Sequence, residues 1–95
     1  MLPTNRIPTH PGEVLLKEFL KPLGVSQVAL AAHIKVPVQR INEIVNGKRG
    51  ITPETAWLLA QALETSPEFW IELQVAFDLA RTRPRRRTKA LTRAD

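Results

Sequence analysis

Two very short amphipathic segments follow one another between residues 26 and 45, and they constrain the fold more than any other feature. The first, "QVALAAHI", begins after Ser26, a typical helix N-cap. The second, "VPVQRINEIV", places Ile41 and Ile44 at helical spacing. Helices of about eight residues are not stable alone in water. They must therefore cross and pack on other helices, which is the helix-turn-helix arrangement whose second helix lies in the DNA major groove.

Three further helices are predicted around this pair. One runs from about Pro11 to Lys21 and is stopped by Pro22 and Gly24, and two begin at Thr52-Pro53 and Ser66-Pro67, where proline suits the first helical position. No alternating strand pattern of useful length occurs, so the sequence predicts an all-α fold of five helices. Its expected inward-facing residues in these three helices are Leu15, Leu16, Phe19, Leu20, Leu23, Ala56, Leu59, Ala60, Leu63, Phe69, Trp70, Leu73, Ala76 and Phe77.

Charge divides the chain into unequal parts. Residues 1–80 hold seven Lys or Arg and eight Asp or Glu, a net charge of −1, whereas residues 81–95 have a net charge of +6. We expect an extended arm at 1–11, one folded domain at 12–80 and a disordered basic tail at 81–95. The high pI therefore comes from the tail, and nucleic-acid binding by the folded domain has to be argued from the positions of its few cations.

Several classes of protein are disfavoured. The chain has no cysteine and no apolar run near the ~18 residues of a membrane span, which suits a cytoplasmic protein. His10 and His33 lack neighbouring ligands at metal spacing, and no Ser or Thr is paired with a His and an acid. We therefore expect no metal, no cofactor, no membrane association and no enzyme activity.

The first turns of the expected second helix carry side chains suited to base edges. Arg40 can donate twice to guanine, Gln39 can pair with adenine, and Val38 can meet a thymine methyl group. Glu43, one turn beyond Gln39, can accept from a cytosine amino group. An equally simple interpretation of the residues alone is a solvated face with an Arg40–Glu43 pair.

The loop after that helix is predicted to contact phosphates. Gly47 can adopt a left-handed conformation and end the helix, which places Lys48 and Arg49 beside the groove. Ser26 and Gln27, at the start of the preceding helix, can contact the other side of the groove. A domain whose net charge is near zero can therefore still have one positively charged edge.

Two motifs carry a resemblance to a known family. The strings "RINEIVNGKRGIT" and "TSPEFW", within a match from about Pro8 to Leu79, resemble the HigA antitoxins, also called virulence-associated protein I, with a Cro/C1-type helix-turn-helix. The resemblance implies a lambda-repressor-like fold and a homodimer that binds a palindromic operator in double-stranded DNA. It also implies autorepression and a partner toxin, HigB, which is an mRNA-cutting ribonuclease.

The resemblance also implies roles for individual residues. It supports base contacts by Val38, Gln39, Arg40 and Glu43. It implies phosphate contacts by Ser26, Gln27, Asn46, Lys48 and Arg49. It implies a dimer surface around Trp70, Leu73 and Phe77, although Trp70 and Phe77 suit a monomer core equally well.

Two features depart from the family pattern. Lys35 stands in the turn where related repressors often have glycine, and a left-handed lysine costs about 1 kcal/mol. The arginine-rich tail is not part of the shared pattern, and phosphate contacts, an acidic partner and a proteolysis-prone end all remain open for it. Alternative functions are a stand-alone repressor without a toxin and a protein-interaction module that uses the tail.

Overall fold

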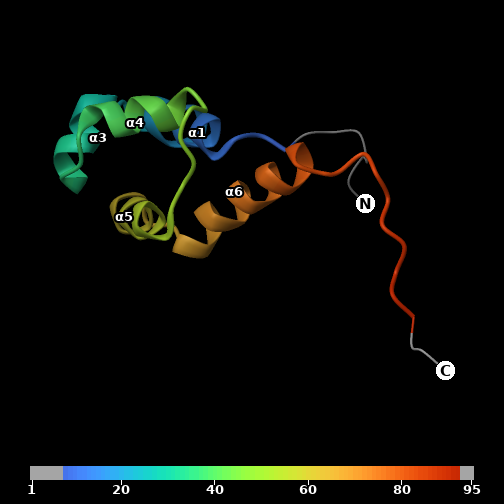
Figure 1. The fold of residues 1–95 in the computed structure, drawn as a ribbon. Coiled ribbons are helices and arrows are strands. Elements are labelled where there is room, and N and C mark those ends of the chain that lie inside the picture. The colour runs from blue at the N-terminus through green and yellow to red at the C-terminus, as the bar shows by residue number, and fades with distance from the viewer. Residues whose placement is uncertain (1–7, 93–95) are drawn as a thin grey trace.

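The structure, a computed structural model, describes residues 8–92, and this part of the chain contains helices and no strand (Figure 1). Three segments run end to end at the start and form one helical rod, so the described part of the chain has the five helices that the sequence predicts. Residues 1–7 of the expected arm lie outside the described part. The helical elements are α1 (Pro11–Val14), η1 (Leu15–Leu20), α2 (Lys21–Leu23), α3 (Gln27–Ile34), α4 (Val38–Val45), α5 (Pro53–Leu63) and α6 (Pro67–Arg81).

The first rod is longer than predicted, because Pro22 does not end it. Between α1 and α2 the backbone is a π-helix, and the Lys21 N–H donates to the Leu16 carbonyl five residues back. This wider turn accommodates a proline without the clash expected in a regular α-helix. The rod ends at Gly24, in the left-handed conformation at φ 67°. Leu23, expected inward, is 61% exposed because it lies in that last turn.

The core is formed by apolar side chains from all five helices. Its largest member, Trp70 of α6, lies against Phe19 and Phe69, with ring centroids 5.4 and 5.0 Å away. Most of the predicted inward positions are buried or half-buried. Ala76 is an exception and is exposed. Helix α6 contacts the rest of the domain through its first half and through the side of the helix that carries Gln74, and Ala76 lies outside both.

Three of the predicted helix starts are confirmed by their caps. The side-chain oxygens of Ser26, Thr52 and Ser66 each accept from the backbone N–H three residues later, at 3.0, 3.3 and 3.1 Å. Each bond satisfies one of the free donors of a helix N-terminus. These local signals fix where α3, α5 and α6 begin.

Gly12 brings the first rod directly onto the backbone of α4. A Cβ atom at this position would overlap the Ile44 carbonyl group. Glycine is therefore required by close packing here, not by its backbone freedom. The contact fixes the end of α4 against the start of α1.

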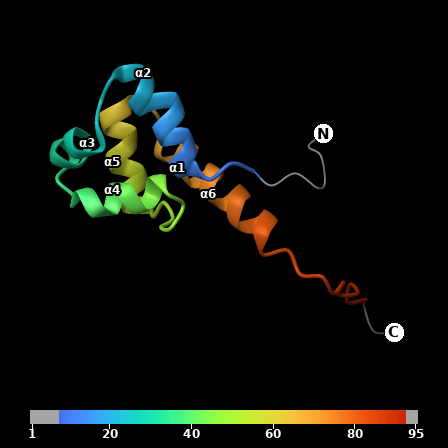
Figure 2. The same cartoon turned by 90° about the horizontal axis from the view of Figure 1, so that it is seen from above.

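Helix α6 extends beyond the other helices, and the chain continues from its end as an extended segment (Figures 1 and 2). Residues 83–92 are exposed and contain no helix or strand. No helix within residues 8–92 is both long and apolar enough to cross a membrane.

Candidate nucleic-acid interface

The start of α3 provides the first polar groups of the site. Ser26 is exposed, and its hydroxyl oxygen accepts from the Ala29 N–H at 3.0 Å. Gln27 follows as the first helical residue and is half-buried. Leu30, Ala31 and Ile34 anchor the opposite side of α3 in the core. The start of α3 is thus held in place with its polar groups toward solvent.

A short turn joins α3 to α4. Lys35 adopts φ 62° and ψ 47°, so the left-handed conformation considered for it is present. The Val36 N–H donates to the Ala31 carbonyl at 3.0 Å, and Pro37 then sets the extended backbone that precedes α4. The turn therefore has the backbone geometry expected of a turn with glycine at this position, and Lys35 adopts the left-handed conformation at a steric cost.

Helix α4 buries one side and exposes the other, as its sequence predicts. Ile41 and Ile44 are fully buried, whereas Val38 and Gln39 are exposed in the first turn. The Arg40 guanidinium is half-buried and lies 3.6 Å from the Glu54 carboxylate of α5. The Arg40–Glu43 pair considered from sequence is not among the ion pairs of residues 8–92.

A row of amides connects α3 to α4. The Asn42 amide donates to the Gln27 side-chain oxygen at 3.3 Å, and the Asn46 amide donates to the Asn42 side-chain oxygen at 3.2 Å. Asn42 was not predicted as a site residue. Its only signal in the sequence is its i, i+4 spacing to Asn46, whereas Gln27 is fifteen positions away. Asn42 orients two of the predicted phosphate-contacting side chains.

Glu43 holds the loop that follows α4. Its carboxylate accepts from the Arg49 guanidinium at 2.8 Å, and its carbonyl oxygen accepts from the backbone N–H groups of Lys48 and Arg49 at 2.8 and 3.2 Å. The Gln39 amide lies 3.5 Å from the second carboxylate oxygen. The structure thus gives Glu43 a contact with the loop that sequence reasoning did not anticipate.

The loop itself is shaped by Gly47, which adopts φ 74° as predicted. Lys48 is exposed, and it takes part in none of the ion pairs found among residues 8–92. Its ammonium group is therefore available to a phosphate, whereas the Arg49 guanidinium is shared with Glu43.

Gln74 of α6 supports the far end of this loop. Its buried side-chain oxygen accepts from the Ile51 N–H at 2.7 Å, and its amide donates to Asp78 at 3.0 Å. Sequence reasoning missed this residue, because a glutamine in an amphipathic helix gives no sign that a loop 23 positions away needs an acceptor.

The three residues predicted at a dimer surface lie in different environments. Trp70 has no exposed surface and donates to the Thr65 hydroxyl at 2.8 Å, so it belongs to the monomer core, as the alternative interpretation held. Leu73 is half-buried against the core, and the Phe77 ring packs edge-on against His10 at 4.8 Å. A side chain without exposed surface has none to offer a second subunit.

His10 begins the first rod. Its Nδ1 atom accepts from the Gly12 N–H at 2.9 Å, which makes it the N-cap of α1. Burial lowers the pKa of His10, and Arg81 lowers it further, while Asp78 acts in the opposite direction. The expected extended arm thus gives way to an ordered cap by residue 10.

These contacts define a class of protein. Two short helices joined by a tight turn, with amides and a guanidinium along the exposed edge of the second, form a helix-turn-helix of the kind that binds DNA. Consistent with this, residues 16–70 match the model of the family described as helix-turn-helix.

Matches to individual proteins identify a more specific family within the helix-turn-helix class. The chain is 46% identical over 76 residues to virulence-associated protein I of Dichelobacter nodosus, covering 79% of this chain and 70% of the relative. It is 40% identical over 90 residues to antitoxin HigA-1 of Vibrio cholerae, covering 95% and 85%. The solved Pseudomonas aeruginosa antitoxin HigA with the higBA promoter superposes with a TM-score of 0.76 at 42% identity, covering 78% and 80%.

The chain belongs to the HigA family of antitoxins, which carry a Cro/C1-type helix-turn-helix. The resemblance drawn from the two sequence motifs is confirmed. The family consists of DNA-binding regulators rather than enzymes, which agrees with the prediction of no enzyme activity.

Proposed function

We propose that this protein is a sequence-specific DNA-binding antitoxin. It binds a palindromic operator as a homodimer, represses its own operon and neutralises a HigB-type ribonuclease toxin in the cytoplasm. The observation that carries the proposal is the polar edge of α4, where Gln39 is exposed, Arg40 is half-buried beside Glu54, and the amide row begins at Gln27. The solved Pseudomonas aeruginosa HigA with the higBA promoter, a protein 42% identical to this one, supports DNA binding by this fold.

In this proposal α4 lies in the major groove. Arg40 and Gln39 donate to base edges, and Val38 contacts a thymine methyl group. Arg40 exchanges its 3.6 Å contact with the exposed Glu54 for a guanine, which costs little because exposed ion pairs contribute only about 0–1 kcal/mol. Glu43 has one carboxylate oxygen bonded to Arg49, so a cytosine contact falls to the other.

Phosphates are bound on both sides of the groove. Ser26 and Gln27 contact one strand from the start of α3, and Lys48 and Arg49 contact the other from the loop. Asn46 adds an amide donor at the end of α4. These contacts set the position of α4 on the duplex but do not read its sequence.

The dimer surface of this proposal is an apolar stripe on α6. Ile71, Val75 and Leu79 recur every four residues, and Val75 and Leu79 are 48% and 67% exposed. At the start of the stripe, Ile71 and Trp57 line a hollow of about 360 Å³. Leu73 and Phe77, which the sequence predicted at the dimer surface, lie instead on the opposite side of α6, against the core and His10. A two-fold dimer would place two α4 helices about 34 Å apart, in successive major grooves.

Toxin neutralisation rests on family membership. Antitoxin HigA-1 of Vibrio cholerae aligns with 95% of this chain, and the Pseudomonas aeruginosa promoter bound by its HigA is named for both higB and higA. A HigB-type ribonuclease encoded next to this gene is the expected partner.

The DNA-binding part is tested with the DNA upstream of the gene. The full chain should protect a palindromic site at nanomolar concentration and bind a scrambled duplex of the same length at least ~1,000-fold more weakly. Equal affinity for both duplexes would contradict sequence-specific recognition, and the protein-interaction hypothesis would take its place.

The toxin part is tested separately with the product of the adjacent reading frame. RNA cleavage by that product should cease when this protein is added in equimolar amount. Specific operator binding combined with undiminished RNA cleavage would instead establish a stand-alone repressor.

A further inference from the structure

The tail after α6 concentrates most of the positive charge of the protein. Arg83, Arg85, Arg86, Arg87 and Lys89 lie within seven positions and are all exposed. Among the ion pairs of residues 8–92, none includes any of them; the last basic residue that is paired is Arg81, 3.6 Å from Asp78. This basic tail, residues 83–89, therefore carries charge that the fold itself does not use.

The DNA-facing side of the domain has little free positive charge by comparison. Arg40 lies beside Glu54, and Arg49 is bonded to Glu43 at 2.8 Å. Lys48 is the cation of this side that lacks such a partner in the described part of the chain. Residues 1–80 as a whole have a net charge of −1. Release of counterions from phosphates, which dominates DNA affinity, would be small for such a domain alone.

The fold starts the tail on the side where the loop after α4 lies. The buried Gln74 of α6 accepts from Ile51 at the end of that loop, and Phe77 packs on His10 at the start of the rod that contacts α4. From Gln74 to Arg81 the helix rises only about 10 Å. Figure 2 shows α6 leaving the domain beside the loop and α1. The basic tail thus leaves the domain on the side of this loop, about two helical turns beyond the bond between Gln74 and Ile51.

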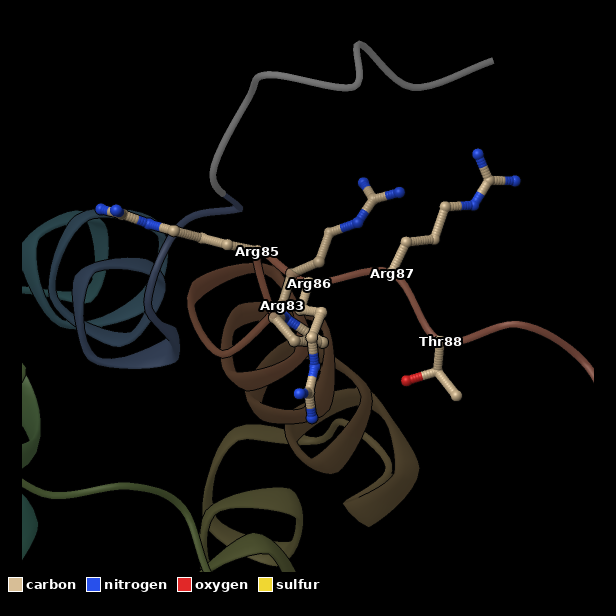
Figure 3. A pocket seen from close by; sticks show the side chains of 6 residues that line it. Arg83, Arg85, Arg86, Arg87 and Thr88 are labelled. Atoms are coloured by element: carbon tan, nitrogen blue, oxygen red, sulfur yellow. The ribbon is translucent and has the colours of Figure 1, made fainter.

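The arrangement of the arginines fits a long polyanion rather than a small anion. Figure 3 shows Arg83 and Arg85 pointing to different sides of the chain, away from Arg86 and Arg87. Pro84 disfavours continuation of α6, and an extended segment of seven residues spans about 23 Å. A run of several successive phosphates on one strand of a duplex occupies a comparable length along the helix axis.

We propose that residues 83–89 bind the phosphates of the duplex that flanks each operator half-site, without reading its sequence. This inference rests on the proposed DNA-binding function. It assigns the electrostatic part of the affinity to the tail and the discrimination between bases to α4. An acidic protein is the competing occupant of the tail, and the experiment below distinguishes the two.

The experiment compares three forms of the full chain: the natural sequence, the R85Q/R86Q/R87Q variant and the R85K/R86K/R87K variant. Each is titrated with a minimal operator duplex, with an operator extended by about ten base pairs on each side, and with a scrambled duplex of that longer length. Affinities are measured between about 50 and 200 mM salt. Because the three arginines lie outside the core, all forms should have the same melting temperature.

The expected result is a shallower salt dependence for the glutamine variant. Three lost phosphate contacts change the slope of log K against log salt by about 2.7 per tail, which is about 40-fold in affinity over a fourfold salt change. The longer flanks should strengthen binding of the natural and lysine forms clearly more than binding of the glutamine form, which keeps only Arg83 and Lys89 in this segment. Its preference for operator over scrambled DNA should be unchanged, since phosphate contacts are not selective.

Two results would overturn the proposal. One is a glutamine variant whose salt slope, and whose gain in affinity from the longer duplex, equal those of the natural protein. The tail would then be assigned to a protein partner. The other is a lysine variant as weak as the glutamine variant, since charge would then not be the cause. Absence of operator preference in all three forms would instead refute the proposed function, whatever the salt slopes show.

Discussion

Helices α4 and α6 both bury one side and expose the other, but they expose opposite chemistry. The exposed edge of α4 carries amides and a carboxylate, which are bonded to each other, to Gln27 of α3 and to Arg49 of the following loop. The exposed edge of α6 carries Val75 and Leu79. Polar edges suit base pairs and phosphates, whereas an apolar stripe suits another protein surface. The two helices thus divide recognition of DNA from association with protein.

The largest expected effect tests which tryptophan anchors the α6 side. Trp70→Ala should lower the free energy of unfolding by about 3–5 kcal/mol, because Trp70 is fully buried. The matched change Trp57→Ala should lower it much less, since Trp57 is 57% exposed and loses only partly buried contacts beside the proposed dimer stripe. Urea denaturation of both variants measures the difference. Similar losses in the two would contradict the assignment of Trp70 to the core.

The second prediction concerns the bond that joins the two sides. Gln74→Ala should destabilise the fold by about 1–3 kcal/mol, because the buried N–H of Ile51 loses its acceptor. The exposed Gln61 of α5 provides the control, and Gln61→Ala should be nearly neutral. Thermal melts followed by circular dichroism give both values. Amide hydrogen exchange at Ile51 should accelerate in the first variant only.

The third prediction separates the roles of two cations on the α4 side. Arg40→Ala should reduce discrimination at one base pair of each half-site by about 1–3 kcal/mol. Lys48→Ala should weaken binding to all sequences alike and reduce the salt slope by about one unit per chain. A panel of single-base operator variants, titrated at several salt concentrations, measures both. The assignment of roles would be wrong if the two variants behaved alike.

The fourth prediction uses two left-handed helix ends, one on each side. Lys35 ends α3 at φ 62°, and Glu64 ends α5 at φ 55°. Replacing either with glycine should stabilise the protein by up to about 1 kcal/mol, because glycine adopts this conformation without steric cost. The reverse change Gly24→Ala, at φ 67° with open space around it, should destabilise by a similar amount. Denaturation midpoints of the three variants provide the test.

The smallest effect concerns His10, which joins the first rod to α6. Its pKa is lowered in the folded state, chiefly by burial, so the unfolded chain binds the proton first as pH falls below about 6.5. The contribution of His10 is therefore fully present above that pH and is lost as pH falls through the lower folded pKa. His10→Asn, which keeps a capping oxygen, should remove this dependence. Stability measured from pH 8 to 5 shows whether the slope disappears.

The comparison also explains what the sequence could and could not predict. Caps such as Ser26 and Thr52 act over three residues, so their helices were predicted correctly. Pro22 was predicted to end the first helix but does not, because the π-helical turn before it leaves space for the proline ring. Gln74 and Ile51 are far apart in sequence, and neither residue type indicates that a hydrogen bond joins them.

For the interface, helical spacing placed Gln39 and Arg40 on the exposed edge of α4, but it gave no information about partners beyond the helix. Arg40 faces Glu54, and Glu43 holds Arg49, through contacts that depend on how the loop and α5 fold back. Trp70 and Leu73 share an amphipathic pattern that suits a core and a dimer surface equally. Only the packed structure shows that Trp70 is enclosed.

The close contact of Gly12 with Ile44 has a consequence for how this gene can change. Every amino acid other than glycine carries a Cβ atom, and at this position that atom would meet the backbone of α4. No missense mutation of codon 12 is therefore conservative, however small the new side chain. Among descendants of this gene, substitutions should be common at exposed positions outside the proposed DNA-binding residues and absent at this one codon.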